Sequence, residues 1–515
     1  MSSGDTYEPF DRSTGTSYSV STSLNSKCYN NPMESRAKIT FYGGAGSVTG
    51  ANFLLDTGSA KILIDCGALE REHVCDEENT KSFAYDPSSV DALIITHAHQ
   101  DHIGRVPKLV HDGFKGIIYS TAATKDLAAL MFEDAVRIMH TEAERHGCPI
   151  MYEKEDYERA LSLWKTHEYH EVFEIPEIKP QKVEMRHTTV TGGLTAGILI
   201  ELLDAGHILG SAMVKLSRAA SAQASAAQNR TIIFTGDLGN SPEPLLNDTE
   251  SPESANYLVM ESVYGDRVHE DRVERLNILK GAIQSAIERK GTLLIPSFSL
   301  ERTQILLFEL KKMFENGEIA PISVFLDSPL AESATDIYRK YVSLMNPEAQ
   351  KQFEDGHDAF SFQGLNVVMN SEHSRMIHDE PDPKVIIAGA GMSSGGRIRS
   401  HERRYLSDKN ASVLFVGYQA PGSLGRRIEE GQKSVEIDGQ KVTVRASISA
   451  LSGYSGHKDR DGLLLFAEQA GESLEEVFVV MGEPSTELFL AQRIGDFLGV
   501  DARVPTTGQS AEIDF

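Results

Sequence analysis

The chain has 515 residues, of which 40% are hydrophobic and 24% are charged, a composition that suits two or three globular domains, each burying its own core. The formal net charge of −25 speaks against non-specific nucleic-acid binding over the whole surface, while it leaves room for a local basic channel. No two of the four cysteines form a CxxC pair, so a bound metal is expected to use histidines and carboxylates rather than thiolates.

The chain begins with a stretch rich in Ser, Thr, Asn and Gly that lacks the apolar run of a signal peptide. We therefore expect residues 1–36 to be a disordered leader and the protein to be cytoplasmic, with no membrane partner. Short apolar runs broken by glycines then predict a meander of strands over Lys38–Tyr42, Asn52–Leu55 and Lys61–Asp65. Taken alone, Asp65 is typical of a turn former at a strand end.

A dense set of ligand-type side chains follows the apolar run Ala92–Ile95, which places it on a turn at the end of a buried strand. The sequence there reads THAHQDH. His97 and His99, two apart, point the same way, while Asp101 and His102 can reach a neighbouring ion. The alternative is a solvated turn that happens to be rich in histidine. Three imidazoles and a carboxylate within six residues favour a metal site.

Two later strand ends carry further ligand-type side chains. Ile198–Leu203 leads into His207, whose small neighbours allow its imidazole to approach a metal closely. Thr231–Phe234 leads into Asp237, which is well placed to bridge two cations because a shared carboxylate offsets their repulsion.

Hydrophobic spacing indicates helices over Thr124–His146 and Glu153–Lys165, with Trp164 in the core. From about Val268 to Gly425, helical and strand patterns alternate, which predicts a parallel sheet with flanking helices. The expected elements there are helices over Arg272–Arg289 and Arg302–Asn316 and strands over Thr292–Ile295 and Ile322–Leu326.

The THAHQDH motif resembles the ligand motif of the metallo-β-lactamase fold, which holds a pair of zinc ions. The stretch Tyr257–Arg267, YLVMESVYGDR, resembles the ESTYGDR signature of the β-CASP nucleases, a branch of that fold with an inserted domain. Similar segments occur in the family's order from Lys38 to about Val500. Within the β-CASP family the chain resembles the RNA-processing branch. It is similar to the bacterial and archaeal homologues of the endonuclease subunit of the cleavage and polyadenylation specificity factor.

This resemblance implies an α/β fold: a metallo-β-lactamase αββα sandwich with an inserted β-CASP α/β domain. The sandwich is expected in two parts, residues 37–265 and 425–515. The β-CASP domain is expected between them, at residues 266–424.

The resemblance also implies a pair of zinc ions with a hydroxide between them. His97, His99 and His207 would hold one ion. Asp101, His102 and His457 would hold the other, with His457 taken from the segment LSGYSGHKDR, which resembles the family's FSGH motif. Asp237 would bridge the two ions. The resemblance also makes four acidic side chains catalytic: Asp65, Asp101, Asp237 and Glu261. Of these, Asp65 would help to orient the hydroxide, and Glu261 is the acidic residue of the YLVMES stretch.

Candidate substrate contacts lie in the glycine-rich segment IIAGAGMSSGGR, Ile386–Arg397, and in the arginines that follow it. Its backbone amides and the guanidinium groups could hold phosphates. The rival interpretation is a solvated helix face, but an acidic protein that must admit a polyanion favours the phosphate interpretation. The candidate substrate-binding residues are Arg302, Ser394, Gly395, Gly396, Arg397, Arg426 and Arg427.

The segment GSLGRR, ending at Arg427, resembles the GTLGRR stretch of bacterial and archaeal members. The eukaryotic processing endonuclease has a histidine, thought to be its general acid, at the position that aligns with Arg426. A guanidinium cannot donate a proton near neutral pH, so Arg426 is expected to stabilise charge on the phosphate. The proton would then come from water or from His401, for which a helix-surface position is the alternative.

Together these features predict a zinc-dependent ribonuclease that leaves a 5′-phosphate and a 3′-hydroxyl, cutting as an endonuclease and, as a second mode, as a 5′–3′ exonuclease. RNA is favoured over DNA because the GSLGRR and SGHKDR segments resemble the RNA-processing branch. A homodimer or a processing complex stays open. The alternatives are a DNA-directed β-CASP nuclease and a non-catalytic β-CASP scaffold subunit of an RNA-processing complex. Ligands at every expected metal position argue against the scaffold.

Overall fold

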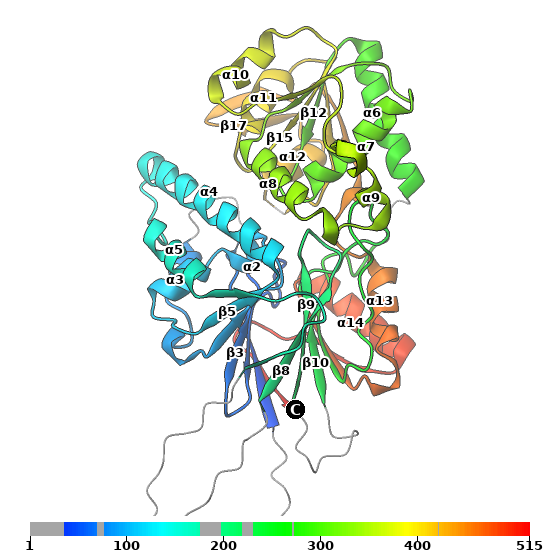
Figure 1. The fold of residues 1–515 in the computed structure, drawn as a ribbon. Coiled ribbons are helices and arrows are strands. Elements are labelled where there is room, and N and C mark those ends of the chain that lie inside the picture. Colours follow the sequence, from blue (N-terminus) through cyan, green and yellow to red (C-terminus); the bar gives the residue numbers. More distant parts are fainter. Residues whose placement is uncertain (1–35, 70–76, 176–196, 219–229, 270–271, 421) are drawn as a thin grey trace, which may run out of the picture. The chain divides into compact units, whose positions relative to one another are not determined.

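The computed structural model describes residues 36–69, 77–175, 197–218, 230–269, 272–420 and 422–515 (Figure 1). The leader predicted at residues 1–36 therefore lies outside the described residues, apart from its last position. None of the helices in the described part of the chain combines the length and the apolar character needed to cross a membrane.

Two seven-stranded sheets pack face to face and form the centre of the first domain (Figure 1). Successive side chains of a strand point to opposite faces. In β3, Ile62 and Ile64 therefore enter the core shared by the two sheets, whereas Leu63 faces away from it. In spatial order the first sheet is β22 (Ser510–Asp514), β1 (Arg36–Gly43), β2 (Asn52–Asp56), β3 (Lys61–Ile64), β4 (Ala92–Ile94), β5 (Ile117–Ser120) and β6 (Trp164–Thr166), and the second is β21 (Asp501–Arg503), β20 (Glu476–Val480), β11 (Tyr257–Glu261), β10 (Thr231–Phe234), β9 (Ala212–Arg218), β8 (Ile198–Asp204) and β7 (Phe173–Ile175).

Helices cover the outer face of each sheet. Leu63 of the first sheet packs with Leu109 and Leu127 of the helices that follow β4 and β5. On the second sheet, Ile233 packs with Phe466 of the C-terminal helices. The αββα sandwich predicted from the sequence is thus confirmed. The covering helices are α2 (Gln100–Ile103), α3 (Val106–His111), α4 (Ala122–His146) and α5 (Lys154–Ser162) on one side and α13 (Arg460–Gln469) and α14 (Pro484–Leu498) on the other; α1 (Glu77–Thr80) precedes β4.

A third sheet of six parallel strands forms the inserted domain, as predicted. Leu293 on one face packs with α7, and Leu294 on the other packs with α11 and α12. The spatial order is β14 (Leu365–Val367), β13 (Ser323–Leu326), β15 (Lys384–Ala388), β12 (Thr292–Pro296), β16 (Ser412–Phe415) and β19 (Ser447–Ala450). Its helices are α6 (Arg272–Arg289), α7 (Arg302–Glu315), α8 (Pro329–Lys340), α9 (Pro347–Lys351), α10 (Ser371–Met376), α11 (Ile398–Tyr405) and α12 (Leu424–Glu429), and a hairpin of β17 (Ser434–Ile437) and β18 (Gln440–Thr443) follows them.

Two sequence boundaries differ from the elements observed. The third sheet includes β19, which lies beyond the domain boundary predicted at residue 424. The helix predicted over Glu153–Lys165 ends at Ser162, because Trp164 starts strand β6, which pairs with β5. Trp164 is buried as expected, and its indole N–H donates to Ser120 Oγ at 2.8 Å. The sheet edge gained by pairing with β5 therefore overrides the helical spacing.

Candidate metal centre

Five strands deliver all of the predicted ligands and acids except His457 to one edge of the sandwich. β3 and β4 run parallel in the first sheet, and β8, β10 and β11 share one direction in the second. Strands that run in one direction end at the same edge of a sheet. The side chains that lie at or just after these ends are Asp65, His97, His99, Asp101, His102, His207, Asp237 and Glu261.

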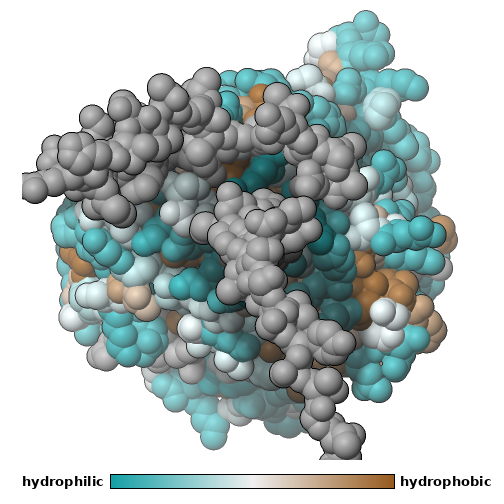
Figure 2. All heavy atoms as spheres, turned by 90° about the horizontal axis from the view of Figure 1, so that it is seen from below, coloured by the Kyte–Doolittle hydropathy of each residue, from teal (hydrophilic) through white to brown (hydrophobic). Residues whose placement is uncertain are grey.

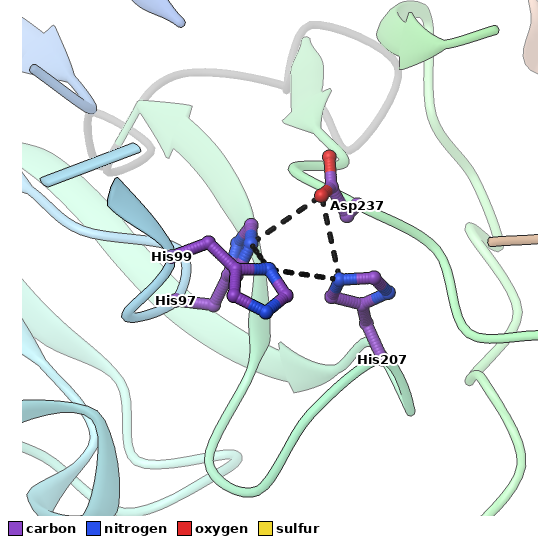
Figure 3. A group of neighbouring side chains, drawn as sticks. All are labelled: His97, His99, His207 and Asp237. Atoms are coloured by element: carbon purple, nitrogen blue, oxygen red, sulfur yellow. Dashed lines mark hydrogen bonds and ion pairs between the residues drawn. The ribbon is translucent and has the colours of Figure 1, made fainter. Parts of the chain in front are cut away.

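Three histidines and one aspartate converge on a single point (Figure 3). His99 Nδ1 lies 3.1 Å from His97 Nε2 and 3.3 Å from His207 Nε2. Asp237 Oδ2 lies 3.3 Å from His97 Nε2 and 3.4 Å from His207 Nε2. Ligands about 2.0–2.1 Å from a tetrahedral zinc are separated by roughly 3.3 Å. The four distances above match this separation, and all four ligand atoms lie within 4.8 Å of one another.

The second carboxylate oxygen of Asp237 faces another histidine. Asp237 Oδ1 lies 3.3 Å from His102 Nε2, and Asp101 Oδ2 lies 3.9 Å from the same nitrogen. His102 Nε2 is buried and has no hydrogen-bond partner among the described residues. A buried ring nitrogen without a partner is costly, and a metal ion would satisfy it. Asp237 therefore offers one oxygen to each of two ligand groups.

Two of the rings that face this centre are hydrogen-bonded through the nitrogen that points away from it. His102 Nδ1 donates to Asp65 Oδ2 at 2.7 Å, and His207 Nδ1 donates to the Gly456 carbonyl oxygen at 2.9 Å. His457 Nδ1 donates to Glu261 Oε1 at 3.1 Å and is also the ring nitrogen that lies 3.9 Å from Asp237 Oδ2. For His102 and His207, the bond from the outer ring nitrogen to an oxygen fixes the tautomer that leaves the other nitrogen for a metal. The backbone carbonyl of Gly456 carries no side-chain signal, which is why sequence reasoning missed it.

Asp65 and Glu261 contact protein donors in the structure. Asp65 accepts from the Thr96 amide and from Thr96 Oγ1, both at 2.8 Å, besides His102. Glu261, fully buried, accepts from the Leu238 amide at 2.7 Å and from His457. Both acids thus position a histidine. The role of Asp65 at a hydroxide and the catalytic role of Glu261 stay predictions.

Burial and mutual charge set the protonation of the centre. Burial lowers the pKa of His99 and of His207 well below the usual range, so both rings are neutral, as a metal ligand must be. Burial acts in the same direction on His457, but the Glu261 and Asp237 carboxylates outweigh it and raise its pKa to about 9. At Asp237 burial is opposed by His102, His457 and His97, and its pKa is lowered well below the usual range.

The sequence is similar to known proteins over most of its length. Three family models match: Metallo-beta-lactamase superfamily at residues 47–181, Beta-Casp domain at 303–428 and Zn-dependent metallo-hydrolase RNA specificity domain at 441–505. Ribonuclease TTHA0252 of Thermus thermophilus is 34% identical over 88% of this chain and 95% of its own length. The chain belongs to the β-CASP family of metallo-β-lactamase-fold proteins.

Two further β-CASP relatives are transcription termination factors named FttA. The protein of Methanothermobacter thermautotrophicus is 30% identical over 93% of this chain and 72% of its own length. That of Pyrococcus horikoshii is also 30% identical, over 91% of this chain and 70% of its own length. Family membership makes the chain a metal-dependent hydrolase and implies that it binds a divalent metal, and the structure contains a His/Asp cluster.

Arg302, predicted to bind substrate, starts α7 of the β-CASP domain and lies beside the metal centre. Its side chain is buried, and Nη1 has no hydrogen-bond partner among the described residues. A Cβ at Gly456 would lie 2.3 Å from Arg302 Nη2 and 2.8 Å from His207 Cε1. Only glycine therefore fits between this guanidinium and the metal ligand.

The glycine-rich segment closes on itself, and the arginine at its end is already bonded. The Ala390 amide donates to the Gly395 carbonyl oxygen, and Gly396 has φ +71° where a Cβ would clash with Gly389. Arg397 donates to Asp327 Oδ1 at 2.6 Å and to the Val368 carbonyl oxygen at 2.8 Å. These bonds occupy donors that the phosphate interpretation needs, and that interpretation of Ser394, Gly395, Gly396 and Arg397 stays a prediction.

His401 is fully buried, so the helix-surface interpretation is wrong. Its Nε2 donates to Asp327 Oδ2 at 2.7 Å, and its Nδ1 lies 3.3 Å from His378 Nε2. Both partners belong to the β-CASP domain, so this histidine braces the end of β13 against α11. Its nomination as proton donor stays a prediction that these contacts do not favour.

Arg426 and Arg427 lie on α12, next to one another. Arg426 is partly exposed, and its Nε donates to Glu430 Oε1 at 2.8 Å. It lines a cavity whose wall includes Tyr264, and the Tyr264 ring lies 6.2 Å from the ring of His457. Arg426 thus brings positive charge to the surroundings of the metal centre.

Proposed function

We propose that this chain is a zinc-dependent ribonuclease that hydrolyses RNA phosphodiester bonds at the edge of the sandwich. The observation that carries the proposal is that the two carboxylate oxygens of Asp237 face different histidines. Oδ2 lies 3.3 Å from His97 Nε2, and Oδ1 lies 3.3 Å from His102 Nε2. A carboxylate arranged in this way suits a pair of metal ions. The relative named a ribonuclease and the match to an RNA specificity domain support RNA as the substrate.

In this proposal the ligands divide into two sets. His97, His99 and His207 would hold one zinc, and Asp101, His102 and His457 would hold the other, with Asp237 shared by the two sets. Bound there, the zinc pair supplies an activated water and Lewis-acid stabilisation of the charge that develops on the phosphate.

The chain's own residues do the rest. Asp65 keeps His102 in the tautomer whose Nε2 faces the centre, and Glu261 fixes the ring of His457. Arg426, Arg427 and Arg302 provide positive charge for the RNA backbone, which an acidic chain with net charge −25 needs at its site. A guanidinium holds its proton, so Arg426 stabilises phosphate charge and water delivers the proton to the leaving oxygen.

Cleavage is proposed to be endonucleolytic, with 5′–3′ exonucleolytic trimming as a second mode of the same site. The second candidate function is a DNA-directed nuclease. A cytoplasmic location, and a homodimer or a processing complex, stay predictions.

The test uses purified protein of measured metal content with 5′-labelled and 3′-labelled RNA and matching DNA. We expect about two zinc ions per chain and RNA products that carry 5′-phosphates and 3′-hydroxyls. Asp237→Asn should cut slower by orders of magnitude, because the shared carboxylate loses charge for both ions. Asp56→Asn is the matched control, since Asp56 also ends a strand and its one side-chain hydrogen bond among the described residues comes from the Gly58 amide at 2.9 Å. Active protein without zinc, or a preference for DNA, would refute the proposal.

A further inference from the structure

A cavity of about 200 Å³ lies where the chain enters and leaves the β-CASP domain. Tyr264 and Arg267 come from the turn after β11. Tyr418 and Gln419 follow β16, and Arg426 and Glu429 lie on α12. The two halves of the molecule therefore build this cavity together.

Two tyrosines give the cavity a rigid aromatic wall. Tyr264 is buried and packs edge to face against Tyr418, with ring centroids 6.0 Å apart and planes at 80°. The Tyr418 hydroxyl donates to Glu483 Oε1 at 2.6 Å, which fixes its ring. Because Tyr264 is covered and Tyr418 is only half-buried, Tyr418 is the ring that a ligand can stack on.

Charged and polar groups surround this wall. The Arg267 guanidinium carbon lies 5.8 Å from the Tyr264 ring centroid, and Arg426 lines the same cavity. Among the described residues each arginine has one carboxylate partner, Asp266 for Arg267 at 2.7 Å and Glu430 for Arg426 at 2.8 Å, and its other N–H groups can contact a ligand. Gln419 adds a buried acceptor, Oε1, that has no hydrogen-bond partner in the described part of the chain.

The cavity adjoins the metal centre through Tyr264, whose ring lies 6.2 Å from that of His457. An exposed aromatic face beside guanidinium groups and a free acceptor is the chemistry that binds unstacked bases of single-stranded RNA. We propose that the cavity is a nucleobase pocket, which holds one base next to the scissile phosphate by stacking it on Tyr418 between Arg267 and Arg426. This inference rests on the proposed ribonuclease function.

The test uses a set of RNAs with one abasic ribose, moved one position at a time past the cleaved bond. Stacking on an aromatic side chain is worth roughly 1–3 kcal/mol per base, so loss of the base at one position should slow single-turnover cleavage by about fivefold or more. Tyr418→Ala should slow cleavage of intact RNA by a similar factor. It should also cut intact and abasic RNA at equal rates, because the stacking partner is gone.

Two control variants separate stacking from folding. Tyr418→Phe keeps the ring and loses only the bond to Glu483, so it should still discriminate against the abasic position. Tyr341→Ala removes another half-buried tyrosine whose hydroxyl bonds a carboxylate, Asp126 at 2.8 Å, outside this cavity, and it should behave as wild type. Thermal unfolding and zinc content confirm that each variant is folded.

Two outcomes would overturn the pocket. One is equal wild-type rates for every abasic position, and the other is full discrimination by folded Tyr418→Ala. Fluorescence anisotropy of labelled intact and abasic RNA on Asp237→Asn measures the same preference without cleavage. If wild type cuts no RNA, the proposed function fails, and this binding comparison still decides whether the pocket holds a base.

Discussion

Asp65→Asn should weaken one metal position and leave the other in place. Asp65 Oδ2 accepts from both Thr96 Oγ1 at 2.8 Å and His102 Nδ1 at 2.7 Å. An asparagine of the same size keeps one oxygen for the Thr96 amide and turns an NH₂ group toward those two donors. His102 then has its proton favoured on Nε2, the nitrogen that faces Asp237, and that nitrogen can no longer bind a metal.

The size of the effect follows from the role of such outer partners. Losing one typically costs about 10–100-fold in metal affinity or activity, or roughly 1.4–2.7 kcal/mol. His99 and His207 make no hydrogen bond to Asp65, and His97 meets it through Thr96 Oγ1, which lies 3.1 Å from His97 Nδ1, so their ion should lose less affinity.

Zinc competition with a chelator, read alongside single-turnover RNA cleavage, measures both quantities. Wild type should bind two ions tightly, and Asp65→Asn one tightly and one about 10–100-fold more weakly, with cleavage reduced in proportion. Asp56→Asn again serves as the control. Wild-type affinity for both ions in folded Asp65→Asn would refute the tautomer argument, and an equal loss of both ions would show that the effect is not local to His102.

Three further substitutions test other parts of the structure. Arg426→Ala should slow RNA cleavage and reduce its salt dependence by about one phosphate contact, and Arg426→Lys should recover part of the rate. The control is Arg137→Ala, which removes an exposed arginine with a comparable helical ion pair and should leave the rate and its salt dependence unchanged. If Arg426→Ala cuts at the wild-type rate at every ionic strength, Arg426 does not touch RNA. Arg275 is buried between Glu243 and Glu309. Arg275→Met should lower the free energy of urea unfolding by about 3–5 kcal/mol because it leaves two carboxylates unpaired, and the triple variant Arg275→Met, Glu243→Gln, Glu309→Gln should recover part of that loss. A loss below about 1 kcal/mol in Arg275→Met would contradict this. Burial raises the pKa of Glu402 from 4.5 to about 8, so its neutral form stabilises the fold fully below pH 4.5, and this contribution is lost as pH rises through 8. Glu402→Gln cannot ionise and should lose less stability than wild type between pH 5 and pH 9, as measured by urea midpoints; parallel losses would show that the carboxyl does not titrate in this range.

The sequence allowed prediction of what depends on neighbours along the chain. The apolar run before His97 sets a buried strand, and the turn after it brings three imidazoles together, because both follow from local spacing. Helix α6 matches its predicted limits, Arg272–Arg289, for the same reason.

Contacts between distant segments were beyond such reasoning. α11 has the sequence IRSHERRY, which indicates a solvated helix, yet His401 is buried because its partner Asp327 lies 74 residues earlier. The carbonyl group of Gly456 that holds His207, and the pairing of Trp164 with β5, are likewise products of tertiary packing.

The hydrogen bond from His207 to Gly456 spans 249 residues, with the whole β-CASP domain between its two ends. During synthesis at about 5–20 residues per second, His207 therefore waits roughly 12 to 50 s before its acceptor exists. In that interval the THAHQDH histidines have left the ribosome and can already bind stray metal ions, while His457 is still missing. Because Gly456 directly precedes His457, the bond that holds His207 and the arrival of His457 are completed together, late in synthesis.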